Sequence, residues 1–137
     1  MVLYYVYNSG GLMKIIISNS SSIPIYEQIK NQIITQIMND DLNEGESIPS
    51  IRSLANDIKI SLMTIKKAYD ELEKEGYIKS VQGKGTFVAP KNLELAHERA
   101  NKDIEDHIMK IIEISTKYNI SKKEIIDLFE YIYGSDE

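Results

Sequence analysis

The chain has 137 residues, of which 42% are hydrophobic and 27% charged, a composition typical of one or two small globular domains. Its 16 Lys and Arg against 21 Asp and Glu give a net charge of −5, which argues against nucleic-acid binding because that function usually has a basic footprint. The lack of cysteine excludes disulfides, thiolate nucleophiles and cysteine-based metal sites. No apolar run reaches the roughly 18 residues of a membrane span and the start resembles no signal peptide, so we expect a cytoplasmic protein without a membrane partner.

The first 13 residues allow two interpretations. The apolar residues 1–7 are followed by a break at residues 8–11, and a fresh pattern opens at Met13. Residues 1–13 are therefore either a non-native or disordered extension outside the fold or a genuine edge strand. The β-branched run at residues 14–17 then predicts a brief strand.

A helix-turn-helix is predicted in the middle of the chain. From Pro24, isoleucine recurs at every fourth position and predicts an amphipathic helix of about residues 24–40. After the turn-forming residues 43–49, Ser50 and Ser61 can each cap a short helix, because a serine hydroxyl accepts a hydrogen bond from a free N–H of the first turn. Two short helices joined by a tight turn make a helix-turn-helix.

A β-hairpin follows these helices. Residues 77–81 and 86–89 are rich in β formers and flank a glycine-containing turn at residues 82–85. A hairpin in this place is the wing of a winged helix, and Pro90 then marks a domain boundary. We expect residues 14–90 to form a winged helix-turn-helix domain in a mostly helical α+β fold.

Two helices are predicted beyond the boundary. Apolar residues repeat at near-heptad spacing over about residues 93–118, and Ser121 with Glu124 forms a capping box that opens a last helix. Two such helices cannot enclose a core, so they cover the winged domain or pair with a second chain, and the near-heptad spacing favours the second arrangement. We expect residues 91–137 to be a dimerisation domain. Its expected contact residues are Ile104, Ile108, Ile111, Tyr118, Leu128 and Phe129.

The excess negative charge is concentrated in these last helices. Residues 1–90 have 9 basic and 10 acidic side chains, a net charge of −1, whereas residues 91–137 have 7 basic and 11 acidic ones, a net charge of −4. Residues 50–69 hold four basic side chains against Asp57 alone, and residues 77–90 hold two lysines and no acid. The second helix of the helix-turn-helix thus begins in a basic region, and such helices contact base edges with their N-terminal residues. The acidic balance of the whole chain therefore does not exclude DNA binding.

Four motifs, in order along the chain, carry a family resemblance. They are residues 24–29 (Pro-Ile-Tyr-Glu-Gln-Ile), 48–55 (Ile-Pro-Ser-Ile-Arg-Ser-Leu-Ala), 64–76 (from Thr-Ile-Lys-Lys-Ala-Tyr to Leu-Glu-Lys-Glu-Gly) and 83–88 (Gly-Lys-Gly-Thr-Phe-Val). These motifs closely resemble the GntR family of bacterial transcription regulators, and the short two-helix end resembles its YtrA subfamily. The resemblance implies a homodimeric repressor that binds a palindromic operator on double-stranded DNA, often in an ABC transporter operon that includes its own gene. It implies no cofactor, and nothing in the sequence specifies an effector.

The resemblance also implies which residues contact DNA. Ser50 and Arg52 contact DNA from the first of the two short helices. A recognition helix of residues 61–75 lies in the major groove, and a wing of residues 77–89 reaches the minor groove. The implied contacts on the recognition helix and the wing are Leu62, Met63, Thr64, Lys66, the weaker candidate Lys67, Gln82, Gly83 and Lys84.

The sequence departs from the family at the start of the recognition helix. Position 62 is often Arg or Pro in the family, whereas here Leu62 is followed by Met63. Neither side chain can make the bidentate contact to guanine that is the commonest specific readout. Apolar contact with thymine methyl groups stays open to them, so we expect half-site positions rich in A·T.

An enzyme is the first alternative to a DNA-binding protein. His97 and His107 lie on different sides of one predicted helix, and the acidic residues near His107 form a solvated face, so no active site or metal site is expected. The turn at residues 83–86 lacks the spacing, the strand and the helix of a phosphate-binding loop. We therefore expect that the protein is not an enzyme. The remaining alternative is a winged helix that binds other proteins and no DNA.

Overall fold

The computed structural model describes residues 1–8 and 11–134. It contains two compact units, Met1–Lys91 and Asn92–Glu137. The fold is mostly helical α+β, with a winged helix-turn-helix in the first unit, as the sequence predicts. The division after Lys91 falls next to Pro90, where the sequence indicates a boundary.

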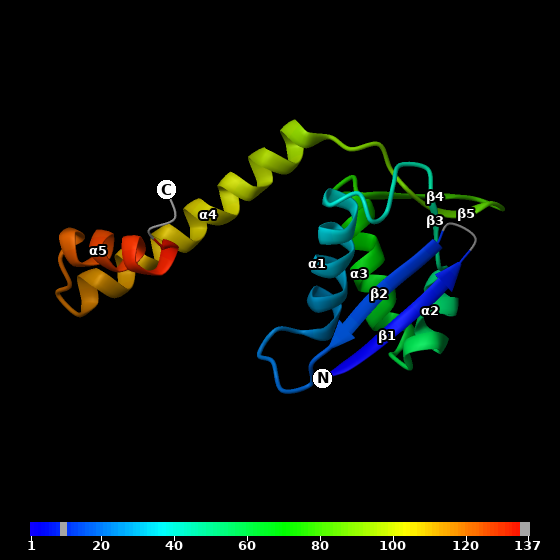
Figure 1. Ribbon diagram of the computed structural model, residues 1–137, viewed down its shortest axis with the longest axis horizontal. Coiled ribbons are helices and arrows are strands. Elements are labelled where there is room, and N and C mark those ends of the chain that lie inside the picture. Colours follow the sequence, from blue (N-terminus) through cyan, green and yellow to red (C-terminus); the bar gives the residue numbers. More distant parts are fainter. Residues whose placement is uncertain (9–10, 135–137) are drawn as a thin grey trace. The chain divides into compact units, whose positions relative to one another are not determined.

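The chain begins with a two-stranded antiparallel ribbon (Figure 1). Strand β1, Val2–Asn8, pairs along its whole length with β2, Gly11–Ile17. Val6 is only 2% exposed and belongs to the same core as the helices. The structure therefore agrees with the second interpretation of the N-terminal residues, an edge strand. Residues 2–8 do not lie outside the fold. The brief strand expected at residues 14–17 is longer because β1 extends its pairing.

Helix α1, Ile25–Met38, begins after Pro24 and buries three isoleucines that recur at every fourth residue. These are Ile29, Ile33 and Ile37. Helix α1 packs beside α3, Leu62–Lys74, as Figure 1 shows. The isoleucine spacing thus puts one apolar stripe of α1 into the core of the first unit.

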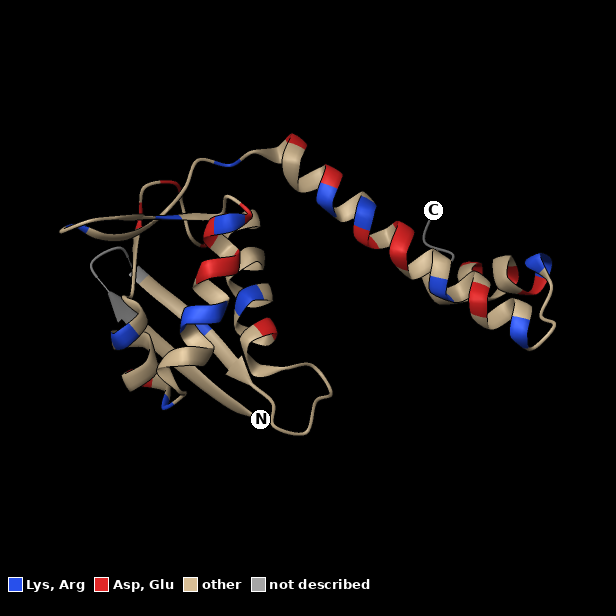
Figure 2. Ribbon diagram, turned by 180° about the vertical axis from the view of Figure 1, so that it is seen from behind, with Lys and Arg blue, Asp and Glu red and all other residues tan. Residues whose placement is uncertain are grey.

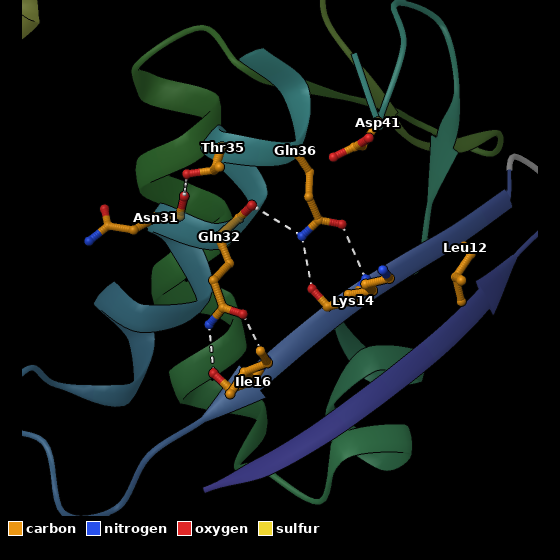
Figure 3. Close-up of a pocket in the computed structure, with 8 residues that line it drawn as sticks. All are labelled: Leu12, Lys14, Ile16, Asn31, Gln32, Thr35, Gln36 and Asp41. Carbon is orange, nitrogen blue, oxygen red and sulfur yellow. Dashed lines mark hydrogen bonds between the residues drawn. The ribbon is translucent and has the colours of Figure 1, made fainter. Parts of the chain in front are cut away.

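Three glutamines on α1 bond the backbone of β2 and of the residue that follows it, and Figure 3 shows two of them, Gln32 and Gln36. Each side-chain amide accepts from one backbone N–H and donates to the carbonyl of the same residue, with distances from 2.6 to 3.1 Å; the pairs are Gln28 with Ser18, Gln32 with Ile16 and Gln36 with Lys14. The spacing matches because four helical residues rise about 6 Å and two strand residues about 6.6 Å. The amides therefore bond the outer edge of β2 as a third strand would.

Helices α2, Ile51–Ile58, and α3 form the helix-turn-helix. The hydroxyl of Ser50 accepts from the N–H of Ser53, and that of Ser61 accepts from the N–H of Thr64. Both serine caps that the sequence predicts are confirmed. They fix where each helix begins.

A buried hydrogen bond joins the two helices of this motif. The hydroxyl of Tyr69 on α3 donates to the carbonyl of Pro49, just before α2, at 2.7 Å. Burial raises the pKa of Tyr69 well above its ordinary value, so the hydroxyl keeps its proton. In the turn between the helices, Lys59 adopts the left-handed conformation with φ of 55°. The bond and the turn together set the orientation of α3.

The wing is part of a three-stranded antiparallel sheet. Strands β4, Ile78–Val81, and β5, Gly85–Val88, form the predicted hairpin, and β3, Ser47–Ile48, pairs with the other edge of β5. For residues 43–49 the sequence predicts only a turn. A strand of two residues is too short to show an alternating pattern, so only its pairing with β5 defines it.

The second unit consists of α4, Leu93–Lys117, and α5, Lys122–Tyr133. The predicted capping box is present at the start of α5, where the Ser121 hydroxyl accepts from the N–H of Glu124 and the Glu124 carboxylate accepts from the N–H of Ser121. Neither helix has a buried residue. The apolar faces of this unit therefore lie in contact with solvent.

Candidate nucleic-acid interface

The N-terminal end of α3 presents its side chains to solvent. Leu62 is 42% and Met63 71% exposed, whereas Ile65 is fully buried. The hydroxyls of Ser61 and Thr64 lie 2.7 Å apart, and the Ser61 hydroxyl also caps the helix. Capping and core packing thus hold this end of the helix in place while its outer residues stay accessible.

The two lysines of α3 that follow are each in contact with a neighbouring side chain. Lys66 Nζ lies 2.6 Å from Asp70 Oδ2, and Lys67 Nζ lies 4.0 Å from the centre of the Tyr26 ring on α1. Exposed contacts of these kinds are worth about 0.3–1 kcal/mol each. They orient both lysines at the surface and can be exchanged for a stronger contact with a phosphate. Sequence reasoning missed Tyr26, because only the packing of α1 on α3 brings it to Lys67.

The acidic residues at the C-terminal end of α3 are paired within the first unit. Lys30 of α1 lies 3.1 Å from Glu71 and 2.7 Å from Glu75. Burial lowers the pKa of Lys30, but hydrogen bonds and charges from the two carboxylates together outweigh burial and raise it. Glu73 accepts from the N–H and the hydroxyl of Ser80. The negative charge at the end of α3 opposite the exposed N-terminus is thus partly compensated.

The start of α2 contributes a cation and a hydroxyl. Arg52 is exposed and makes no hydrogen bond or ion pair with any residue that the structure describes. Ser50 is also exposed, and its hydroxyl accepts from Ser53. Arg52 is therefore available to a ligand without breaking an interaction within the protein.

The tip of the wing is open and basic (Figure 2). Gly83 has a φ of +77°, in the left-handed region, and the N–H of Lys84 donates to the carbonyl of Val81 at 2.9 Å. A Cβ at Gly83 would meet nothing within 4 Å, so the backbone conformation and not crowding requires glycine. The side chains of Gln82, Lys84 and Lys79 are exposed, and neither lysine pairs with an acid in the described part of the chain.

The six residues expected at a dimer contact are all exposed, five on α4 and α5 and Tyr118 directly after α4. Within the second unit, an apolar groove of about 450 Å³ runs between the two helices. Four of the six residues line this groove: Ile104, Ile108, Ile111 and Phe129. Tyr118 and Leu128 are exposed outside it. The structure thus brings four of these residues to one apolar surface.

A second hollow, of about 500 Å³, lies between β2 and α1 (Figure 3). Its lining includes Gln32 and Gln36, whose amides are already bonded to β2. These two amides therefore stabilise the fold. Among residues 1–8 and 11–134 there is no cluster of side chains that could hold a metal ion, and no helix long and apolar enough to cross a membrane.

An exposed helix N-terminus in a helix-turn-helix, followed by a basic wing, defines a class of DNA-binding domain. Residues 25–88 match the family described as bacterial regulatory proteins, gntR family. The chain belongs to this GntR family. It is a transcriptional regulator with a DNA-binding domain and not an enzyme.

Individual relatives agree with this assignment. YhcF of Bacillus subtilis (strain 168), described as an uncharacterized HTH-type transcriptional regulator, is 31% identical over 78% of this chain and 88% of its own length. YtrA of the same organism, described as an HTH-type transcriptional repressor, is 42% identical over 50% of this chain and 53% of its own. A crystal structure described as a transcriptional antiterminator from Listeria monocytogenes EGD-e is 34% identical, with a TM-score of 0.62 over 89% of this chain and 94% of that one. The chain thus spans most of YhcF and about half of YtrA.

Proposed function

We propose that the protein is a homodimeric repressor of the YtrA type that binds a palindromic operator on double-stranded DNA. The observation that carries this proposal is the exposed N-terminal end of α3, together with cations that have no acidic partner in the described part of the chain. They include Arg52, Lys79 and Lys84. Winged helices of this kind insert one helix into the major groove and use phosphate contacts for register.

In the proposed complex, residues 61–75 lie in the major groove and the wing of residues 77–89 reaches the minor groove. Ser50 and Arg52 contact the DNA from the start of α2. Met63 and Lys66 lie on the accessible side of α3, and a phosphate replaces Asp70 as the partner of Lys66. The further proposed contacts are Leu62, Thr64, Lys67, Gln82, Gly83 and Lys84.

The proposed dimer forms through the second unit. The isoleucines of α4 lie at near-heptad spacing and are exposed to water, and burying one such side chain contributes about 1.5–3 kcal/mol. A second copy of the same unit presents the same face, so α4 and α5 of two chains can cover each other. The expected contacts are Ile104, Ile108, Ile111, Tyr118, Leu128 and Phe129. A two-fold dimer matches a palindromic operator, because each half-site then meets an identical helix-turn-helix.

The YtrA type is supported by the 42% identity to the repressor YtrA over half of this chain. The proposed target is a transporter operon that includes the regulator's own gene. Sequencing the DNA beside this gene tests the proposal. We expect transporter genes and an inverted repeat in their promoter, and neighbouring genes without any inverted repeat would contradict the target.

A mobility-shift assay with the full chain tests DNA binding itself. The probe is a duplex selected from a random pool, and binding is measured at roughly 50 and 200 mM salt. We expect the logarithm of the affinity to fall with a slope of about −0.9 for each phosphate neutralised, because binding releases counterions. No shift at either salt concentration would favour the alternative, a winged helix that binds other proteins.

A further inference from the structure

The exposed apolar side chains of the first three helices gather at the start of α3. Among the large apolar residues of α1, α2 and α3, Leu62 and Met63 alone are exposed. The other apolar positions of α3 are buried in the core, including Ile65 and Leu72. These two residues therefore add little to the packing of the first unit, and their solvent contact costs free energy unless a partner covers them.

The polar side chains at the same end of α3 are engaged with one another. The hydroxyls of Ser61 and Thr64 bond each other, Lys66 bonds Asp70, and Lys67 lies over the Tyr26 ring. Residues 61–67 also include no arginine, asparagine or glutamine. Of the side chains that make bidentate contacts to guanine or adenine, this end of the helix thus has only the two lysines, and both already have a contact within the protein.

We propose that Leu62 and Met63 read thymine through its C5-methyl group. This inference rests on the proposed DNA binding and specifies how one part of the operator is recognised. In the major groove, the methyl group distinguishes thymine from the other bases and offers an apolar surface. Leu62 supplies a branched apolar end, and the unbranched thioether of Met63 adapts to an irregular surface. Each half-site therefore has thymines at the positions that face these two residues.

Removing single methyl groups from the DNA tests the inference. Duplexes are first selected from a random pool with the full-length protein, and each thymine of the half-site is then replaced by deoxyuridine, which lacks only the methyl group. We expect one or two replacements per half-site to weaken binding by roughly two- to fourfold each, because each methyl is worth somewhat less than 1 kcal/mol when buried. Replacements elsewhere in the duplex should have no effect.

Two variants assign the effect to the side chains. With Leu62→Ala or Met63→Ala, binding should become insensitive to one of these replacements, since the partner of that methyl is gone. Lys84→Ala on the wing is the matched control, because it should weaken binding to thymine and deoxyuridine duplexes by the same factor. Thermal unfolding should be unchanged in all three variants, as the substituted side chains are exposed.

The outcomes separate the inference from the function on which it rests. Selected duplexes that bind with steep salt dependence but tolerate deoxyuridine at every position would overturn methyl readout and leave DNA binding intact. A selected half-site with G·C at the positions that face Leu62 and Met63 would do the same. If the protein selects no duplex, the proposed function fails and the inference fails with it.

Discussion

The two units of the protein use isoleucine in opposite ways. In α1, Ile29, Ile33 and Ile37 lie four residues apart and are buried. In α4, Ile104 and Ile108 have the same spacing, yet both are about half exposed. The same pattern thus produces a core in one unit and an open surface in the other. Periodicity predicts which face of a helix is apolar, but the rest of the fold determines what covers that face.

Every buried apolar residue that the structure describes lies in the first unit. Its stability therefore comes from contacts within one chain, whereas the proposed stability of α4 and α5 comes from contacts between two chains. Stability of the first kind does not depend on protein concentration, and stability of the second kind does.

The largest expected effect separates these two kinds of stability. Ile33→Ala should lower the free energy of unfolding of the first unit by about 2–5 kcal/mol, because the side chain is fully buried and leaves a cavity. Urea unfolding should show the same loss at every protein concentration. Ile108→Ala is the matched control, and its effect should depend on concentration. A concentration-independent loss for Ile108→Ala would contradict the proposed role of α4.

A charge in the second unit tests the proposed interface directly. Ile111→Glu should separate the dimer, because a buried carboxylate without a partner is strongly unfavourable. Light scattering should then give a mass near 15.7 kDa in place of about twice that value, and operator affinity should fall. Lys110→Gln changes the charge by the same amount on another side of α4 and should leave the mass unchanged. An unchanged mass for Ile111→Glu would remove this face from the interface.

Arg52 of the first unit is an expected contact with the operator DNA. Arg52→Ala should weaken operator binding by about 1–3 kcal/mol if the side chain reads a base, and by less if it contacts only phosphate. Unfolding should be unaffected, because Arg52 has no partner among residues 1–8 and 11–134. Titration of a labelled duplex measures the affinity. Full affinity in the variant would exclude Arg52 from the interface.

The smallest expected effects come from the helix caps, one in each unit. Ser61→Ala removes the cap of α3 and should cost about 1 kcal/mol of unfolding free energy, and Ser121→Ala should cost a similar amount in α5. Hydrogen exchange can follow the amides of both first turns. Faster exchange is expected in α3 only for the first variant and in α5 only for the second. Equal effects of one variant on both helices would show that the units unfold together.

Much of the fold follows from local chemistry and was predictable. The caps at Ser50, Ser61 and Ser121 need only neighbouring N–H groups, so sequence spacing locates them within one residue. The hairpin of β4 and β5 is also local, since its turn requires a left-handed residue and Gly83 supplies one.

The features that the sequence could not predict all join distant segments. Strand β3 exists only through pairing with β5, and the contact of Lys67 with Tyr26 depends on how α1 packs against α3. The same is true of Lys30, which pairs with Glu71 on α3 and with Glu75 just after it. The proposed DNA-binding residues could be predicted from the family motifs, whereas the interactions that orient them are visible only in the three-dimensional structure.

The glutamines of α1 have a consequence for the outer edge of β2. A β-strand with free backbone groups invites a strand of another molecule, and residues 15–17 are three consecutive isoleucines, a sequence that favours such growth. Gln32 and Gln36 bond the groups that an incoming strand would need. A helix therefore protects this strand from intermolecular aggregation, and two amide side chains at a spacing of four residues achieve what other proteins obtain with a proline or a charge on the edge.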